Sequence, residues 1–160
     1  MQPDRLRTFI DDVGFVVGST DDEYEITARI PERLSALLAV GNRLPPEVTR
    51  PSPVRHVTYP LYIAPDGSGS MASVVWDMGQ RTPVHGHETW GVVGIYSGVE
   101  HEVRYVKPAA SAASASLTSA GEKRWEAGQV MVCCTTDDDV HAVVAAGNEL
   151  EDLLVGHLCL

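Results

Sequence analysis

The stretch GQRTPVHGHETWGVVGIYSGVEHEVRY, from Gly79 to Tyr105, decides the fold and the candidate site of this chain. At its centre lie His85 and His87, separated only by Gly86. Side chains on an extended segment alternate between its two faces, so both imidazoles are expected on one face, a few ångströms apart. Neutral imidazole is the commonest metal-binding side chain. The pair therefore predicts half of a metal site.

The residues that follow this pair predict strands. Residues 92–96 are rich in β-branched and aromatic side chains, and Ser97-Gly98 supplies a turn before the next strand at 99–106. In that strand, apolar and aromatic positions alternate with charged ones. One face is therefore expected to be buried and the other to be exposed to solvent. The exposed face would carry Glu100, Glu102 and Arg104.

Strand-like segments also occur elsewhere in the chain. They are predicted at 55–64 and 70–79 and, after an Ala/Ser-rich loop at 108–121, in four short pieces up to the C-terminus. Many short strands without an alternating helix between them indicate a mainly β protein with a small jelly-roll barrel.

The N-terminal part predicts helices instead. Residues 3–17 place Leu6, Phe9, Ile10 and Val13 at helical spacing. A second helical segment at 22–40 contains Pro31, which kinks or divides a helix. We expect these helices to cover the outside or one edge of the barrel. The predicted organisation is a single domain over residues 1–160, with a helical segment at 1–43 and the barrel at 55–160.

Composition restricts the binding partners and the cellular compartment that are expected for this protein. The chain has 160 residues and a net charge of −10, which argues against binding to nucleic acid or to an anionic membrane. No apolar run approaches the roughly 20 residues that span a bilayer. The three cysteines include no Cys-x-x-Cys pair, so a reduced, cytoplasmic setting is expected. The expected state is a monomer or a homodimer.

A third histidine completes the predicted site. His141, in DDDVHAVVAAG, lies in another short strand-like segment and would face His85 and His87 if the two strands oppose each other in a barrel. Three imidazoles leave metal positions open for a substrate and for oxygen. Glu88 should point to the opposite face of the strand and is a poor acidic ligand. Glu100 is the alternative, but it fits the Ser-Gly-x-Glu turn better than the metal.

The segment MGQRTPVHGHETWGVVG at 78–94, with the Ser-Gly-x-Glu turn at 97–100, resembles the bacterial thiol dioxygenases of the cupin superfamily. These include relatives of cysteine dioxygenase and 3-mercaptopropionate dioxygenase. The resemblance covers about residues 59–107 and continues more loosely through Asp138-Asp139-Val140-His141. It implies a cupin fold, one Fe(II) per chain on the three histidines, and insertion of both atoms of O2 into the sulfur of a small thiol to give a sulfinic acid.

The C-terminal segment departs from that family. Its Ser-x-His-x-Tyr pattern corresponds here to Val155-Gly156-His157-Leu158-Cys159, so only His157 is retained. His157 is therefore a candidate for a role behind the metal ligands, or else a core histidine. The sequence stops at Leu160, where 3-mercaptopropionate dioxygenases continue to a carboxylate-binding arginine, so a carboxylated thiol is in doubt.

Candidates for substrate contact are Tyr62, Arg81, Trp90 and Cys159, with Arg55 and Arg104 as further arginines that could bind a carboxylate. Tyr62 and Trp90 could equally be core aromatics. Three functions remain open at this point. They are a thiol dioxygenase, an iron cupin oxygenase of specialised metabolism acting on another kind of substrate, and a non-catalytic metal-binding sensor.

Overall fold

The computed structural model describes residues 3–39, 44–87, 89–107, 116–133, 140–146 and 154–159, the backbone alone being described at 3–4 and 154–159. Helical elements come first: α1 (Pro3–Val17), α2 (Glu23–Arg29), α3 (Pro31–Ala39) and the 3-10 turn η1 (Pro46–Val48). The strands that follow are β1 (Val57–Ile63), β2 (Ser70–Asp77), β3 (His85–Gly86), β4 (Gly91–Ser97), β5 (Val99–Val106), β6 (Thr118–Glu126), β7 (Val130–Cys133), β8 (Val140–Ala146) and β9 (Leu154–Cys159).

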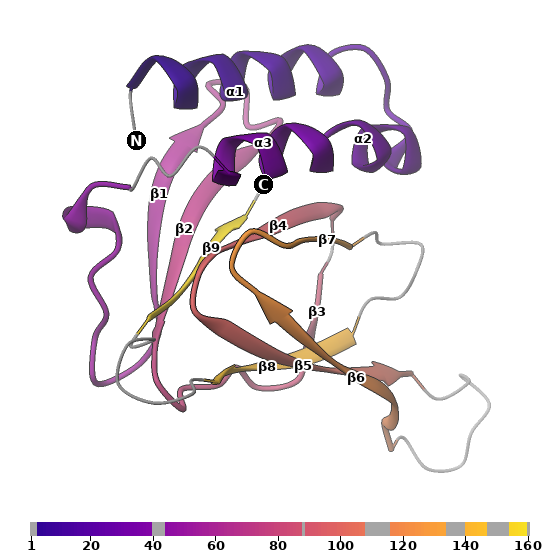
Figure 1. Ribbon diagram of the computed structural model, residues 1–160. Coiled ribbons are helices and arrows are strands. Elements are labelled where there is room, and N and C mark those ends of the chain that lie inside the picture. The colour runs from indigo at the N-terminus through magenta and orange to yellow at the C-terminus, as the bar shows by residue number, and fades with distance from the viewer. Residues whose placement is uncertain are drawn as a thin grey trace.

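The strand order is that of a jelly roll. One sheet has the order β1-β2-β9-β4-β7 and the other the order β3-β8-β5-β6. One long antiparallel hairpin contains, in succession, the strand pairs β5–β6, β4–β7, β3–β8 and β2–β9. Successive pairs belong alternately to the two sheets. A hairpin rolled up in this way is the jelly-roll arrangement, so the predicted fold class is confirmed. The two sheets face each other as separate hydrogen-bonded ladders (Figure 1).

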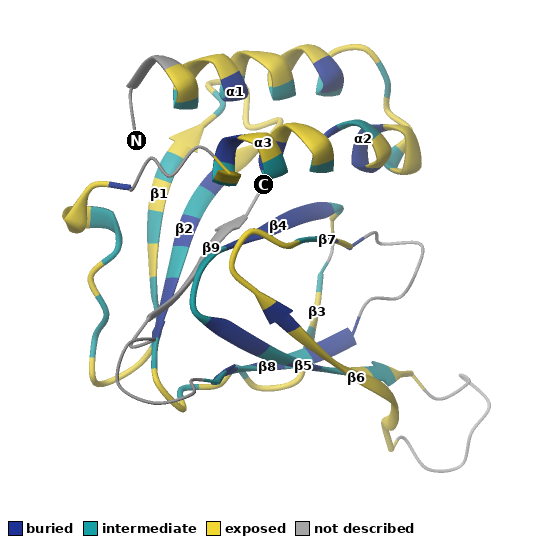
Figure 2. Ribbon diagram, viewed as in Figure 1, coloured by how far each residue is buried: buried dark blue, intermediate teal, exposed yellow. Residues whose placement is uncertain are grey.

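The predicted helices are also confirmed, with the second segment divided at Pro31. Asp22 caps α2 by accepting hydrogen bonds from the backbone N–H groups of Tyr24 and Glu25. Pro31 starts α3, where its missing N–H costs nothing. The helices lie over the five-stranded sheet and turn their buried stripe toward it (Figures 1 and 2). This core contains Phe9, Val16, Ile26, Ile30, Leu34, Leu37, Leu44, Met71 and Val92.

Close approach of α3 to the sheet depends on Gly94 in β4. A Cβ atom at this position would lie 2.8 Å from Cδ1 of Leu38 and 3.0 Å from Cδ2 of Leu34. The absence of a side chain at Gly94 therefore lets α3 pack directly on the strand. Within the described part of the chain, no helix is both long and apolar enough to cross a membrane.

The predicted turn at Ser97-Gly98 is confirmed, with Gly98 at φ 75°, and the strands β4 and β5 on either side of it belong to different sheets. One local prediction needs correction. The predicted loop at 108–121 extends too far, because β6 already begins at Thr118 and pairs with β5. Residues 108–115 lie outside the described residues.

The prediction for the faces of β5 is wrong for its two glutamates, although Val99 is buried and Arg104 is exposed as predicted. The alternation exists, but Glu100 and Glu102 are the buried side chains, with 1% and 0% of their surface exposed. Val103 and Tyr105, on the other face, are only half-buried. Glu102 can be buried because its face of β5 meets His141 and Trp125, which satisfy its carboxylate.

Candidate metal centre

His85 and His141 are direct partners across the β3–β8 ladder. They lie on neighbouring strands of one sheet, not on opposed strands as the sequence suggested. Residues paired directly across antiparallel strands point to the same face, and the centroids of the two rings are 4.7 Å apart. His87 follows the short strand β3, and its ring centroid is 5.0 Å from that of His141. The prediction that His141 would meet the His85/His87 pair is therefore confirmed.

The facing nitrogens of these rings have the spacing of metal ligands. One ring nitrogen from each of the three histidines lies within 4.8 Å of the others, so the group can hold a metal ion. Nε2 of His87 is 3.0 Å from Nε2 of His141. Two metal–nitrogen bonds of about 2.1 Å that meet at a right angle place their nitrogens about 3.0 Å apart. This distance thus fits two ligands of a single ion.

In His141 and His85, the second ring nitrogen forms a hydrogen bond of its own. Nδ1 of His141 donates to Oε1 of Glu102 at 2.8 Å, and Nδ1 of His85 donates to the carbonyl of Pro83 at 3.0 Å. Each bond leaves the Nε2 lone pair of a neutral ring free to face the cluster. Metal-ligating histidines are typically oriented by such bonds to a carboxylate or a backbone carbonyl. The donor set therefore fits a divalent metal.

The segment before His85 is tied to β8. The backbone N–H of Thr82 donates to the carbonyl of Val143, and the N–H of Val143 donates to the hydroxyl of Thr82. Arg81 forms an isolated bridge with Val144. These contacts fix the register that brings His85 opposite His141.

Glu102 is the buried charge of the site. Besides His141, it accepts a hydrogen bond from Nε1 of Trp125 at 2.8 Å, and Nε of Arg104 lies 3.2 Å from its Oε1. Burial opposes ionisation, but the hydrogen bonds from His141 and Trp125 and the charge of Arg104 outweigh it and lower the pKa of Glu102 to about 2. The carboxylate is therefore ionised at neutral pH. Sequence reasoning missed this role because the alternation in β5 was assigned the wrong polarity.

Two of the predicted substrate residues lie at another cavity. Tyr62 and Trp90 line a space of about 840 Å³ between α1 and the β1–β2 hairpin, and none of the three histidines lines it. Trp90 also packs against the core beneath the helices. Arg81 is exposed, consistent with a place at the rim. The structure does not bring these three side chains into the histidine cluster.

The other predicted residues are only partly described. His157 lies in β9, where it is paired with Val74 and Ile95 in the five-stranded sheet, and Cys159 is paired with Ala72 and Val93. The side chains of His157 and Cys159 are outside the described part of the structure, as is Glu88. Glu100, the alternative ligand, is buried on β5, and the group of possible ligands found among the described residues consists of the three histidines.

No protein-family model matches this chain. Solved structures resemble it at low sequence identity. One is a conserved protein of unknown function from Streptococcus pyogenes, with 15% identity over 74% of this chain and 84% of that chain and a TM-score of 0.49. Another is a cupin superfamily protein from Desulfitobacterium hafniense, with 10% identity over 74% and 88% and a TM-score of 0.48. An oxalate oxidase has 18% identity over 68% of this chain and 51% of its own, with a TM-score of 0.46. The jelly-roll assignment itself rests on the strand order of this chain.

Proposed function

We propose that this protein is a metal-dependent oxygenase with a cupin-type centre, and that its reaction is the dioxygenation of a small thiol to a sulfinic acid. The proposal rests on one observation above all. Three imidazoles from two distant segments converge, and two of them are oriented from behind by hydrogen bonds to Glu102 and Pro83. The resemblance of residues 78–94 to thiol dioxygenases supplies the reaction class.

The proposed cofactor is one Fe(II) per chain on His85, His87 and His141. Imidazole ligands suit zinc, copper, nickel and iron alike, so the donor set supports a transition metal and the reaction requires a redox-active one. Bound Fe(II) would supply open coordination positions and the electron transfer between thiol and O2. The overall reaction is balanced without an external reductant, because both oxygen atoms end on a sulfur that loses as many electrons as O2 gains.

The chain's own residues would hold and shield this centre. Glu102 keeps the Nδ1 proton of His141 in place, and the Pro83 carbonyl does the same for His85. His141 is buried, with 7% of its surface exposed, whereas His85 and His87 are half-buried. The open side for a substrate is therefore the side of the His85/His87 pair, whereas the carboxylate of Glu102 behind His141 is itself fully buried.

The experiment is oxygen uptake by protein that was purified without a nickel column and loaded anaerobically with Fe(II). The thiol panel contains 3-mercaptopropionate, cysteine, cysteamine and an aromatic thiol, and mass spectrometry follows the incorporation of ¹⁸O2. We expect at least one sulfinic acid that carries two labelled oxygens. The His141→Ala variant should lose this activity, whereas His101→Ala, which changes a β5 histidine outside the cluster, should retain it.

Two outcomes would count against the proposal. Iron-loaded protein that is silent with every thiol would reject thiol dioxygenation and favour an oxygenase for another substrate or a metal-binding sensor. Equal metal content in wild type and in His141→Ala would reject the metal centre itself.

A further inference from the structure

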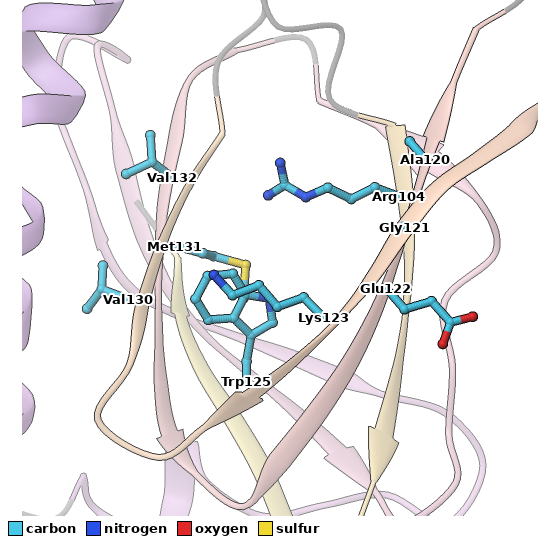
Figure 3. A pocket seen from close by; sticks show the side chains of 9 residues that line it. All are labelled: Arg104, Ala120, Gly121, Glu122, Lys123, Trp125, Val130, Met131 and Val132. Carbon is cyan, nitrogen blue, oxygen red and sulfur yellow. The ribbon is translucent and has the colours of Figure 1, made fainter.

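A second cavity lies beside the candidate metal centre, between β5, β6 and β7. Its volume is about 410 Å³, and Figure 3 shows the side chains that line it. Arg104 extends into this space from β5, with 45% of its side chain exposed. Lys123 reaches over the ring of Trp125, with Nζ 3.5 Å from the ring centroid. Met131 supplies an apolar wall, so two cations and an apolar surface share the cavity.

The charge inside this cavity is unusual for the chain. The protein as a whole carries a net charge of −10, yet Arg104 and Lys123 both line the cavity. Glu122, the acidic side chain on its wall, points away from the space that Arg104 and Trp125 enclose (Figure 3). The carboxylate of Glu102 is already engaged by His141, Arg104 and Trp125. Arg104, which meets Glu102 through its Nε, and Lys123 are therefore the cationic groups that the cavity offers to a ligand.

We propose that this cavity binds a small carboxylate with a short apolar group, and that Glu102 couples its binding to the three-histidine centre. The guanidinium of Arg104 presents a planar set of N–H donors that suits a carboxylate, and its Nε is the atom directed at Glu102. The apolar group lies against Met131 and the Trp125 ring. Lys123 adds a second positive charge at the mouth.

The cavity is distinct from the place of a metal-bound substrate. Nδ1 of His141 is directed at Glu102, whereas its Nε2 faces His87. Arg104 binds the same Oε1 atom of Glu102 that accepts from His141. Arg104 therefore approaches the site from the Nδ1 edge of His141, opposite to the Nε2 atom that faces His87, and none of the three histidines lines the cavity.

Coupling follows from the shared oxygen atom. Arg104 and His141 compete for electron density on Oε1 of Glu102. An anion on Arg104 offsets part of its charge, so the hydrogen bond that Nδ1 of His141 donates to Glu102 strengthens and Nε2 of His141 becomes a better metal ligand. The cavity ligand should therefore raise metal affinity, and by linkage the metal should raise affinity for the ligand equally.

The first test needs no metal. Fluorescence of the metal-free protein is titrated at constant ionic strength with propionate, 3-phenylpropionate and inorganic phosphate, and Trp125→Phe identifies the signal of the cavity. We expect saturable binding that is tightest for 3-phenylpropionate, a loss of about tenfold or more in Arg104→Gln, and a smaller loss in Arg104→Lys and Lys123→Gln. Arg124→Gln is the matched control, because Arg124 neighbours Lys123 on β6, pairs with Glu126 and does not line the cavity.

The proposed site is rejected if no ligand gives a saturable signal, or if Arg104→Gln and Arg124→Gln change ligand affinity equally. It is also rejected if phosphate binds more tightly than either carboxylate. Lys123→Gln changes an exposed side chain, so it reports on the site even where Arg104→Gln folds poorly.

The coupling rests on the proposed metal centre and is measured separately. Metal affinity is compared with and without saturating 3-phenylpropionate, and we expect an increase of about fivefold or more that disappears in Glu102→Gln. If the ligand binds but metal affinity is unchanged, the coupling is rejected and the proposed carboxylate site is retained. Failure of the protein to bind any metal would reject the proposed function, and the fluorescence result would still stand.

Discussion

His85 and His141 face each other across the β3–β8 ladder, with ring centroids 4.7 Å apart. The site is thus built on paired strands, which hold two of its three imidazoles on one face before any metal binds.

We predict that each of His85→Ala, His87→Ala and His141→Ala lowers metal affinity by about 100-fold or more, because removing one of three ligands removes a full coordination bond. Metal content after dialysis, measured by elemental analysis, checks this. His56→Ala is the control, since His56 lies against Trp76 with ring centroids 5.6 Å apart and is outside the cluster. Unchanged metal content in all three variants would mean that the histidines do not form a metal site.

Glu102→Gln should lower metal affinity by about 10- to 100-fold, because the negative partner of His141 is replaced by a neutral amide. A titration with Co(II), whose absorption spectrum reports on the ligand set, measures both affinity and geometry. Glu122→Gln on the exposed part of β6 should behave as wild type. If Glu102→Gln binds metal as tightly as wild type, then Glu102 is a structural residue only.

The stability of the metal-free protein should depend on pH through Glu102. Its folded-state pKa of about 2 lies below the ordinary value of 4.5, so the unfolded state binds more protons between these values and stability falls as the pH drops through this range. The contribution is fully present above about pH 4.5 and is on the order of 3 kcal/mol. Urea unfolding of wild type and Glu102→Gln in the presence of a chelator checks it. The difference between the two proteins should shrink toward low pH, and a constant difference would contradict the assignment.

Gly94→Ala should destabilise the protein by about 1–3 kcal/mol, because the added methyl group would lie 2.8 Å from Leu38 and push α3 away from β4. Chemical denaturation measures this loss. Gly69→Ala is the matched control, since a Cβ atom there meets nothing within 4 Å. Similar stability of Gly94→Ala and Gly69→Ala would show that α3 does not depend on close contact with the strand.

Much of the fold could be predicted from local patterns. The helix at 3–17 followed from its apolar spacing, and the division at Pro31 followed from the missing N–H of proline. The inward face of β5 could not be predicted, because alternation shows only that two faces differ. Whether Glu102 or Val103 faces inward depends on residues far along the chain, here Trp125 and His141.

The sequence by itself determined that His85 and His87 share a face, because the period of two in an extended chain is a local property of the backbone. It also determined that short strands would build a jelly roll. Only the tertiary structure decided that His141 is the direct partner of His85 and that Glu102 lies behind it. The physical reason is that strand pairing joins residues distant in the chain through backbone hydrogen bonds, and its register depends on the packing of the whole barrel.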